Sequence, residues 1–221
     1  MFLENLVFDA TDPQRLGRFW EGVVAGETLT DDDGIYETRL RVDGGPEIDL
    51  CFQQVAENRS DRTRIHLAVL GDLGDTVQRL ADPEGNPYGV ADVRSSYVGT
   101  GPIAAVRWHS ADPDRDAAFW SWLTGWVDAP DVTPRSLRHP SLRGPLLELV
   151  PEQAAKGPDK NWLHLDVRLE PLDDTADEVE AAIVARGGTR LMTDWGDLPW
   201  RSYLDPSGNE FCVLPPYPAT T

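Results

Sequence analysis

One predicted sheet face in the second half of the chain gathers side chains that could do chemistry. Successive side chains of a strand point to opposite faces, and in residues 162–167 apolar and polar side chains alternate. The same alternation in the other strands of this half places one set on the face away from the helices: Arg107, His109, Glu148, Trp162, His164, Asp166, Glu210 and Cys212. Imidazole and carboxylate groups bind metals and transfer protons, so we take this face as the candidate site.

The elements that carry this face belong to a unit that the sequence contains twice. Three segments recur in the same order: residues 8–20 as 108–120, residues 65–69 as 163–167, and residues 82–86 as 205–209. Ordered matches of this kind indicate a duplicated structural unit.

Each unit is predicted to hold two modules of the type β-α-β-β-β, so the fold class is α+β. Asp12-Pro13 and Asp112-Pro113 pair a capping carboxylate with proline at the first helical position. An apolar helical stripe follows the first pair, and strand candidates flank both helices. The Asp205-Pro206-Ser207-Gly208-Asn209 segment is predicted to be a turn that starts the last strand rather than a catalytic motif.

The units are predicted as two tandem domains, residues 1–98 and residues 99–221, and the first is the shorter in its second module. Forty-one positions separate His164 from Asp205, whereas sixteen separate His66 from Asp82. Pro87 stands at the position that corresponds to Glu210 and cannot ligate through its side chain. We therefore expect the first domain to be chemically inert and the second to contain the working site.

Charge and composition exclude several classes of function. Thirty-eight acidic against twenty basic residues give a formal charge of -18, which opposes binding to nucleic acids and anionic membranes. No apolar run reaches the ~20 residues of a membrane span, and the first residues do not read as a signal peptide. Cys51 and Cys212 are too few for a disulfide scaffold, so we expect two reduced, buried thiols and a cytoplasmic protein.

The motifs together resemble the glyoxalase/bleomycin-resistance/extradiol dioxygenase superfamily, also called vicinal oxygen chelate proteins. Asp-Pro followed by Phe-Trp, then His164-Leu165-Asp166-Val167, then residues 205–213 carry the resemblance, which extends over nearly the whole chain. It implies tandem glyoxalase-like domains whose curled mixed sheets form a cup with the helices outside. In many members the cup holds a divalent metal that chelates vicinal oxygens of a substrate; other members bind drugs without a metal.

The resemblance also implies a ligand set. His164 and Glu210 match metal-ligand positions, and Glu148 is a looser match for a further carboxylate. Nickel, zinc, manganese and iron all suit such a set, and Glu210 or Glu148 would carry the proton in catalysis. The first-strand ligand, seven residues before the capping Asp, would be Ala105, which is a departure from the pattern. The alternative is that His164 only forms a hydrogen bond across the sheet.

Further side chains are candidates for contact with a small-molecule ligand. On the predicted cup face these are Arg107, His109, Trp162 and Asp166. Trp195, Trp200 and Tyr203, in the segment that the first unit lacks, could form an aromatic wall for an apolar or planar ligand. The alternative for Trp195 and Trp200 is packing between the two units. Cys212 also faces the cup, as an inert thiol.

Three functions remain open from the sequence. The first is a metal-dependent lyase, isomerase or dioxygenase, and the second is a metal-free protein that binds a drug-like molecule, as in bleomycin resistance. The third is an assembly role, in which the shortened unit is a platform for the other unit or for a second chain in a homodimer. The substrate and the reaction type do not follow from these residues.

Overall fold

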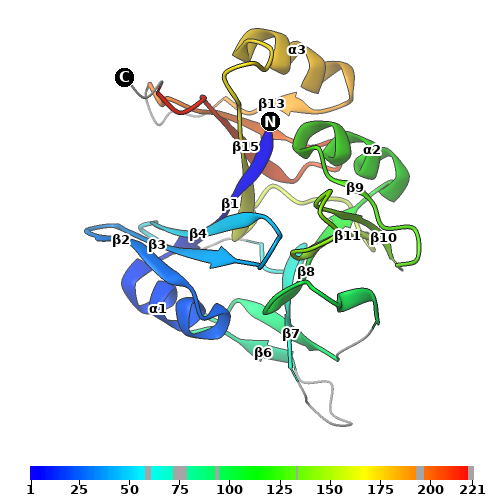
Figure 1. Cartoon of the computed structure of the whole chain (residues 1–221). Helices are drawn as coiled ribbons and strands as arrows, with labels where there is room; N and C mark the ends of the chain where they lie inside the picture. Colours follow the sequence, from blue (N-terminus) through cyan, green and yellow to red (C-terminus); the bar gives the residue numbers. More distant parts are fainter. Residues whose placement is uncertain (58–60, 72–78, 93–94, 133, 193–196, 219–221) are drawn as a thin grey trace.

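The computed structural model describes residues 1–57, 61–71, 79–92, 95–132, 134–192 and 197–218, which form two curved sheets and three α-helices (Figure 1). The larger sheet has eight strands in the order β13-β14-β15-β12-β1-β4-β3-β2. The smaller sheet has seven strands in the order β6-β7-β5-β8-β11-β10-β9. The predicted α+β class, with curled mixed sheets and repeated modules, is confirmed.

The strands of the eight-stranded sheet come from the first and the last module: β1 (Phe2–Ala10), β2 (Glu27–Asp32), β3 (Ile35–Arg41), β4 (Glu47–Gln54), β12 (Leu163–Arg168), β13 (Thr189–Arg190), β14 (Arg201–Leu204) and β15 (Glu210–Leu214). Those of the seven-stranded sheet come from the two middle modules: β5 (Ile65–Leu70), β6 (Arg79–Ala81), β7 (Pro87–Ala91), β8 (Ile103–Ser110), β9 (Val127–Asp128), β10 (Arg135–Arg138) and β11 (Leu146–Pro151).

The two sheets are built on the same plan. In the larger sheet β1 is antiparallel to β12 and parallel to β4, and in the smaller sheet β8 is antiparallel to β5 and parallel to β11. Phe8 lies opposite Leu163 in one sheet, and its repeat counterpart Trp108 lies opposite Ile65 in the other. The repeat is therefore visible in the strand register as well as in the sequence.

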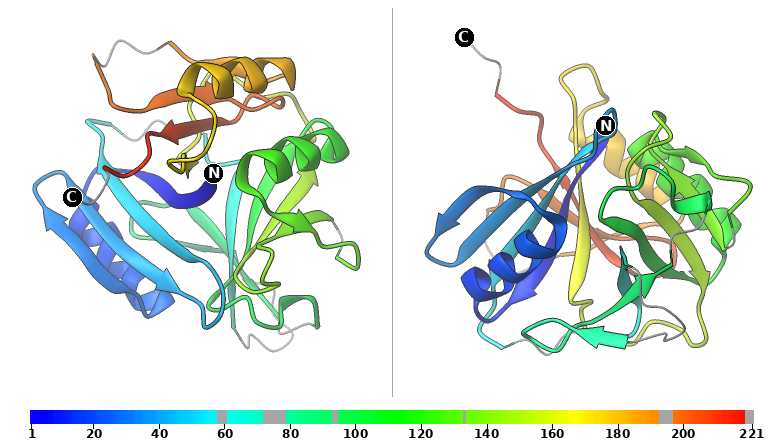
Figure 2. Two further views of the ribbon diagram at one scale, coloured as in Figure 1. Left: turned by 45° about the horizontal axis from the view of Figure 1, so that its top comes forward. Right: turned by 60° about the horizontal axis from the view of Figure 1, so that its bottom comes forward.

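Each sheet takes strands from both halves of the chain. Figure 2 shows the blue β1–β4 and the orange to red β13–β15 on either side of the yellow β12. The predicted boundary at residues 98–99 falls between β7 and β8, which belong to the same sheet. It thus does not separate the two sheets, and whether residues 1–98 and 99–221 fold as independent domains stays a prediction.

Proline and a capping aspartate start the two repeated helices, as predicted. In α1 (Pro13–Val24) the Asp12 carboxylate accepts from the backbone N–H of Arg15 at 3.0 Å, and in α2 (Pro113–Thr124) Asp112 does the same for Arg115 at 3.2 Å. The third helix, α3 (Ala176–Ala185), begins with a capping box between Thr175 and Glu178. None of these helices is long and apolar enough to cross a bilayer.

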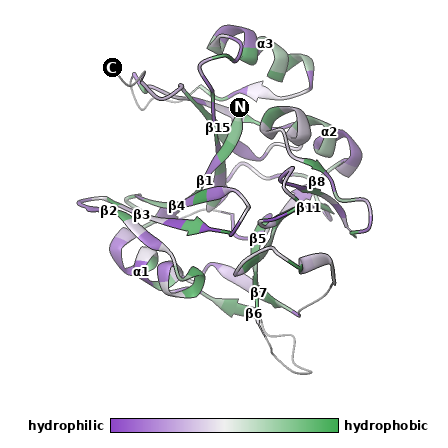
Figure 3. Ribbon diagram, in the orientation of Figure 1, coloured by the Kyte–Doolittle hydropathy of each residue, from purple (hydrophilic) through white to green (hydrophobic). Residues whose placement is uncertain are grey.

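Aromatic side chains join the two sheets into one core. Trp20 of α1 lies 5.2 Å, between ring centroids, from Tyr88 of β7, and Trp120 of α2 lies 5.3 Å from Phe211 of β15. Each helix thus packs on its own sheet and reaches the other one. Figure 3 shows the amphipathic character of α1, with hydrophilic and hydrophobic residues alternating along the ribbon.

The second module is shorter than the fourth, as predicted. Its described residues form three strands, β5–β7, whereas the fourth module has four strands and α3. A short 3-10 helix, Ser95–Tyr97, then leads towards β8.

Candidate functional site

The concave face of the eight-stranded sheet encloses a hollow of about 940 Å³. Side chains of β1, β4, β12 and β15 form its floor, and they are mainly polar: Asn5, Cys51, Gln53, His164, Asp166 and Cys212. An apolar wall rises on one side from the segment before β14 and includes Leu191, Leu198 and Trp200. A volume of this size is within the range of small-molecule sites, about 300–1,000 Å³.

His164, on β12, is a buried imidazole in the floor, with 6% of its surface exposed. Its Nε2 atom lies 3.5 Å from Oδ1 of Asp166, and no described residue forms a hydrogen bond with its buried Nδ1 atom. Burial, with a smaller effect from Lys160, lowers the pKa of His164 well below its ordinary value. The ring is therefore neutral at pH 7, the form in which imidazole binds metals.

Asp166 lies two residues further along β12 on the same face and is 5% exposed. Its Oδ2 atom accepts a hydrogen bond from Nδ2 of Asn5 at 3.1 Å, whereas Oδ1 is buried with no hydrogen-bond partner in the described part of the chain. Burial raises the pKa of Asp166 from 3.8 to about 7. A carboxyl group that titrates near neutral pH inside a cavity is suited to general acid–base chemistry.

Cys212 completes a cluster with these two side chains. It lies on β15, directly opposite Asp166 in the parallel pairing of β12 with β15. Among the described residues, His164, Asp166 and Cys212 form a group whose potential ligand atoms all lie within 4.8 Å of one another. Burial raises the pKa of the Cys212 thiol to about 12, so the thiol is protonated at pH 7 in the absence of a metal.

Glu210 lines the same hollow, but other groups already hold both of its oxygens. Oε1 forms an ion pair with Nζ of Lys156 at 3.1 Å, and Oε2 accepts from the backbone N–H of Asn161 at 3.2 Å. A metal at Glu210 would have to displace these partners.

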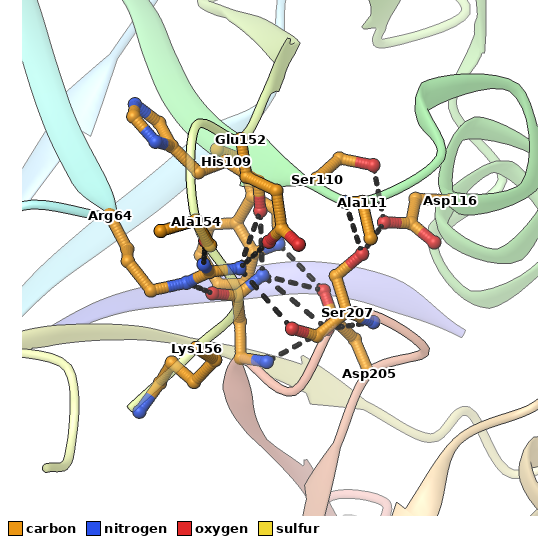
Figure 4. Close-up of polar contacts among 12 residues, drawn as sticks. Arg64, His109, Ser110, Ala111, Asp116, Glu152, Ala154, Lys156, Asp205 and Ser207 are labelled. Carbon is orange, nitrogen blue, oxygen red and sulfur yellow. Dashed lines mark hydrogen bonds and ion pairs between the residues drawn. The ribbon is translucent and has the colours of Figure 1, made fainter. Parts of the chain in front are cut away.

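A buried arginine fixes the turn that leads into β15. Figure 4 shows Arg64, which is 4% exposed, with Glu152, His109 and Ser207 around its guanidinium. Its Nε donates to Oδ1 of Asn209 at 2.9 Å, and one terminal nitrogen lies 2.8 Å from Oε2 of Glu152. Arg64 thus ties the second, third and fourth modules together just before Glu210.

Comparison with protein families supports this architecture. A family model described as a glyoxalase-like domain matches residues 5–83 and 105–214, which include strands of all four modules. The chain belongs to this family. No curated protein matches the sequence.

Solved structures show the fold of this glyoxalase-like chain in other proteins. Glyoxalase I from Zea mays is 15% identical, with a TM-score of 0.67 over 97% of this chain and 92% of that chain. A protein from Bacillus subtilis titled a putative dioxygenase is 14% identical, with a TM-score of 0.61 over 99% of this chain and 86% of that chain. At these identities the likeness concerns the fold alone.

The prediction that Glu148 shares a cup with His164 and Glu210 is wrong for this glyoxalase-like chain. Glu148 lies on β11 in the seven-stranded sheet, with 1% of its surface exposed. Its two oxygens accept from Tyr97 Oη at 2.9 Å and from Arg107 Nε at 3.0 Å. The physical reason is the strand pairing, because β11 pairs with β8, whereas β12 pairs with β15 on one side and with β1 on the other.

The concave face of the seven-stranded sheet is packed with its own small apolar cluster. Ala68, Ala105, Leu146 and Tyr97 are buried together there, next to the Tyr97–Glu148–Arg107 group. Arg107 and His109 therefore do not line the hollow, and the expectation that they contact its ligand is wrong. The His109 ring lies instead 5.7 Å from that of His66.

Two aromatic residues predicted at the ligand also lie in the core. Trp162, which directly precedes β12, is fully buried and donates its indole N–H to the carbonyl of Ile65 at 2.9 Å. Tyr203 pairs with Phe211 across β14 and β15 and stacks on its ring at 5.4 Å. Trp200 does line the hollow, together with Asp166, His164 and Glu210, while Trp195 lies outside the described residues.

The first module contributes polar strand residues that complete the hollow, which the sequence-based prediction of an inert first domain missed. Asn5, Asp9, Cys51 and Gln53 all line it, although their half of the chain was expected to be inert. The position of the first-strand ligand, seven residues before the capping Asp, could have identified Asn5. Asn5 precedes Asp12 by seven residues, as Ala105 precedes Asp112. Because β1, and not β8, lies beside β12, the first-strand position of this hollow is Asn5.

Proposed function

We propose that this glyoxalase-like protein binds a small, mostly apolar organic molecule in the hollow of the eight-stranded sheet. The observation that carries the proposal is the combination of a volume of about 940 Å³ with an apolar wall on one side and a buried polar floor. The wall supplies contact area, and a few polar groups on the floor fix the orientation of the ligand. Trp200 lines the hollow, and an indole ring there can stack on a planar group.

Binding to the hollow can be tested with the fluorescent probe 1-anilinonaphthalene-8-sulfonate. We expect one probe molecule per chain, and we expect Gln53→Trp, which fills the floor, to abolish the signal. The controls are Leu142→Ala and Leu172→Ala, which remove exposed apolar side chains (61% and 99% exposed) away from the hollow. Loss of the signal in a control, with the signal retained in Gln53→Trp, would contradict the proposal.

We propose catalysis in the same hollow as a second candidate, of the lyase or isomerase type. It is favoured by Asp166 in the metal-free chain, because its buried carboxyl group, with a pKa raised to about 7, can both accept and return a proton as long as no metal occupies it. A divalent metal, when bound, would polarise a substrate carbonyl or stabilise an enediolate. A dioxygenase activity is the alternative reaction for this site.

Activity assays distinguish these possibilities. Asp166→Asn should lower any glyoxalase I activity by about 100-fold or more while probe binding persists. Oxygen uptake in an electrode would instead identify the dioxygenase. Turnover that is unchanged in Asp166→Asn would remove Asp166 from the mechanism.

A cytoplasmic location and a homodimer both stay predictions. Cys51 and Cys212 are free and buried, which supports a reducing compartment. Light scattering of the purified chain would determine the oligomeric state.

A further inference from the structure

We propose that His164, Asp166 and Cys212 form a thiolate-containing site for zinc or a similar divalent metal. The resemblance to known proteins implied His164, Glu210 and Glu148 instead. The proposed site keeps the imidazole, but it replaces Glu210 by Cys212, two residues further along β15, and replaces Glu148 of β11 by Asp166 of β12. It stands independently of the organic ligand proposed above.

The strand pairing places these three side chains close together on one face of the sheet. Asp166 and Cys212 lie opposite each other on neighbouring parallel strands, and His164 lies two residues before Asp166 on the same face. Three donors on one sheet face leave the remaining positions of an ion open towards the hollow, the arrangement of a catalytic zinc site.

The distances between the donors fit a single ion. Zinc binds nitrogen and oxygen at about 2.0–2.2 Å, so two such ligands of a tetrahedral ion lie about 3.5 Å apart. Nε2 of His164 and Oδ1 of Asp166 are 3.5 Å apart, and all three donors lie within 4.8 Å of one another. A distance of 3.5 Å is long for a hydrogen bond.

An unpartnered oxygen points to the ligand that the cluster needs. Oδ1 of Asp166 is buried and has no hydrogen-bond partner among the residues that the structure describes, although buried polar atoms normally have one. The other oxygen is held by Nδ2 of Asn5 at 3.1 Å, as outer partners hold a metal-binding carboxylate. A metal at Oδ1 would satisfy the carboxylate, and the charges of Asp166 and a Cys212 thiolate would balance a divalent ion.

Two other potential metal ligands line the hollow, Glu210 and Cys51, but neither is placed to join the cluster of His164, Asp166 and Cys212. Glu210 is already engaged by Lys156 and Asn161. Cys51 lines the same hollow but lies across β1 from His164, since Val7 pairs with both. One imidazole, one carboxylate and one thiolate favour zinc or cobalt over magnesium or manganese.

The test uses cobalt, whose spectrum reports a thiolate ligand. The full-length chain is freed of metal with a chelator and titrated with Co²⁺ in the absence of any organic ligand. We expect one equivalent to produce a sulfur-to-cobalt charge-transfer band in the near ultraviolet that Zn²⁺ abolishes by competition. Cys212→Ser should lose the band and bind zinc at least about 100-fold more weakly, since outer partners alone contribute about 10- to 100-fold.

Cys51→Ser is the matched control, because it removes the other buried thiol of the same hollow. We expect the cobalt band to persist in Cys51→Ser and in Glu210→Gln. If Cys212→Ser does not fold, protection of a single thiol by zinc against a thiol reagent in Cys51→Ser gives the same answer.

The proposal is overturned by a wild-type chain that gives no band, by a band that persists in folded Cys212→Ser, or by unprotected Cys212 in Cys51→Ser. Probe binding is measured separately, so failure of the metal site and failure of the ligand site remain distinguishable.

Discussion

The indole N–H of Trp120 donates to Oδ2 of Asp205 at 3.3 Å and thereby joins the repeated helix to the repeated turn. The first copy contains the same contact, from Trp20 to Asp82 at 3.2 Å. Both aspartates also accept from backbone N–H groups of their own turns. The most recognisable motifs of the sequence are thus parts of the scaffold, as the turn prediction stated.

Asp205→Asn should destabilise the fold by about 2–3 kcal/mol. Oδ1 accepts from the N–H groups of Ser207 and Asn209, and Oδ2 accepts from the indoles of Trp108 and Trp120. Either orientation of a carboxamide would place its NH₂ against donors, leaving buried groups unsatisfied. Urea unfolding at neutral pH measures the loss. Asp33→Asn, at an exposed position, is the control, and equal effects of the two changes would contradict this account.

Gly17→Ala should destabilise the chain, whereas Gly22→Ala should stabilise it. A Cβ at Gly17 would lie 2.1 Å from the Tyr36 ring, but a Cβ at Gly22, in the same helix, would meet no atom of the described residues within 4 Å. We expect a loss of about 1–3 kcal/mol for the first change and a gain of about 0.5–1 kcal/mol for the second. Thermal melting of the two variants separates the steric effect at Gly17 from the gain in helix propensity at Gly22. An increase in the stability of Gly17→Ala would show that the Tyr36 ring can move away from the added methyl group.

The free energy of unfolding of Asp166→Asn should increase, relative to that of the unaltered chain, as the pH rises. The pKa of Asp166 is about 7 in the folded state against 3.8 ordinarily, so between these values the folded chain holds a proton that the unfolded chain has lost. Stability therefore falls as the pH rises through this window. From about pH 4 to about pH 8 the relative gain of the variant should be on the order of 2–4 kcal/mol, measured by urea unfolding with a chelator present. A pH-independent difference would mean that the pKa of Asp166 is not raised.

Arg107→Ala should destabilise the seven-stranded sheet by about 2–4 kcal/mol, because it leaves the buried Glu148 carboxylate with Tyr97 alone. The double change Arg107→Met with Glu148→Leu should recover most of the loss. Neither variant should alter zinc or probe binding, since both residues lie outside the hollow. A loss of metal in the double variant would instead restore Glu148 as a ligand.

Asn5→Ala should weaken zinc binding by about 10- to 100-fold without removing the cobalt–sulfur band. Asn5 donates from Nδ2 to Oδ2 of Asp166 and so acts in this structure as an outer partner of a carboxylate in the proposed cluster. Outer partners orient a ligand in this way and contribute about that much to affinity. Isothermal titration with Zn²⁺ measures the change, with Gln14→Ala, outside the hollow, as the control. Unchanged affinity would remove Asn5 from the site.

Local features of the fold could be predicted from the sequence, and long-range pairing could not. Alternation correctly assigned His164, Asp166, Glu210 and Cys212 to one face, because that pattern depends only on neighbouring residues. It could not show that β1 lies beside β12, a pairing that separates Glu148 from His164 and brings in Asn5. Tyr203 was misplaced although its neighbour Ser202 lines the hollow, since the alternation was not extended to β14. Trp162 lies outside the strand, so alternation did not apply to it.

The nested strand order has a consequence for biosynthesis. All strands of the seven-stranded sheet leave the ribosome before β12 does, whereas β1 must wait for a partner about 160 residues later (Asn5 and Asp166 are 161 apart). A nascent chain can therefore complete the seven-stranded sheet while β1, which later pairs with β12, is still an open edge of the β1–β4 sheet. The hollow is complete only when β15 has been made, so the ligand site appears after every strand of the seven-stranded sheet has left the ribosome.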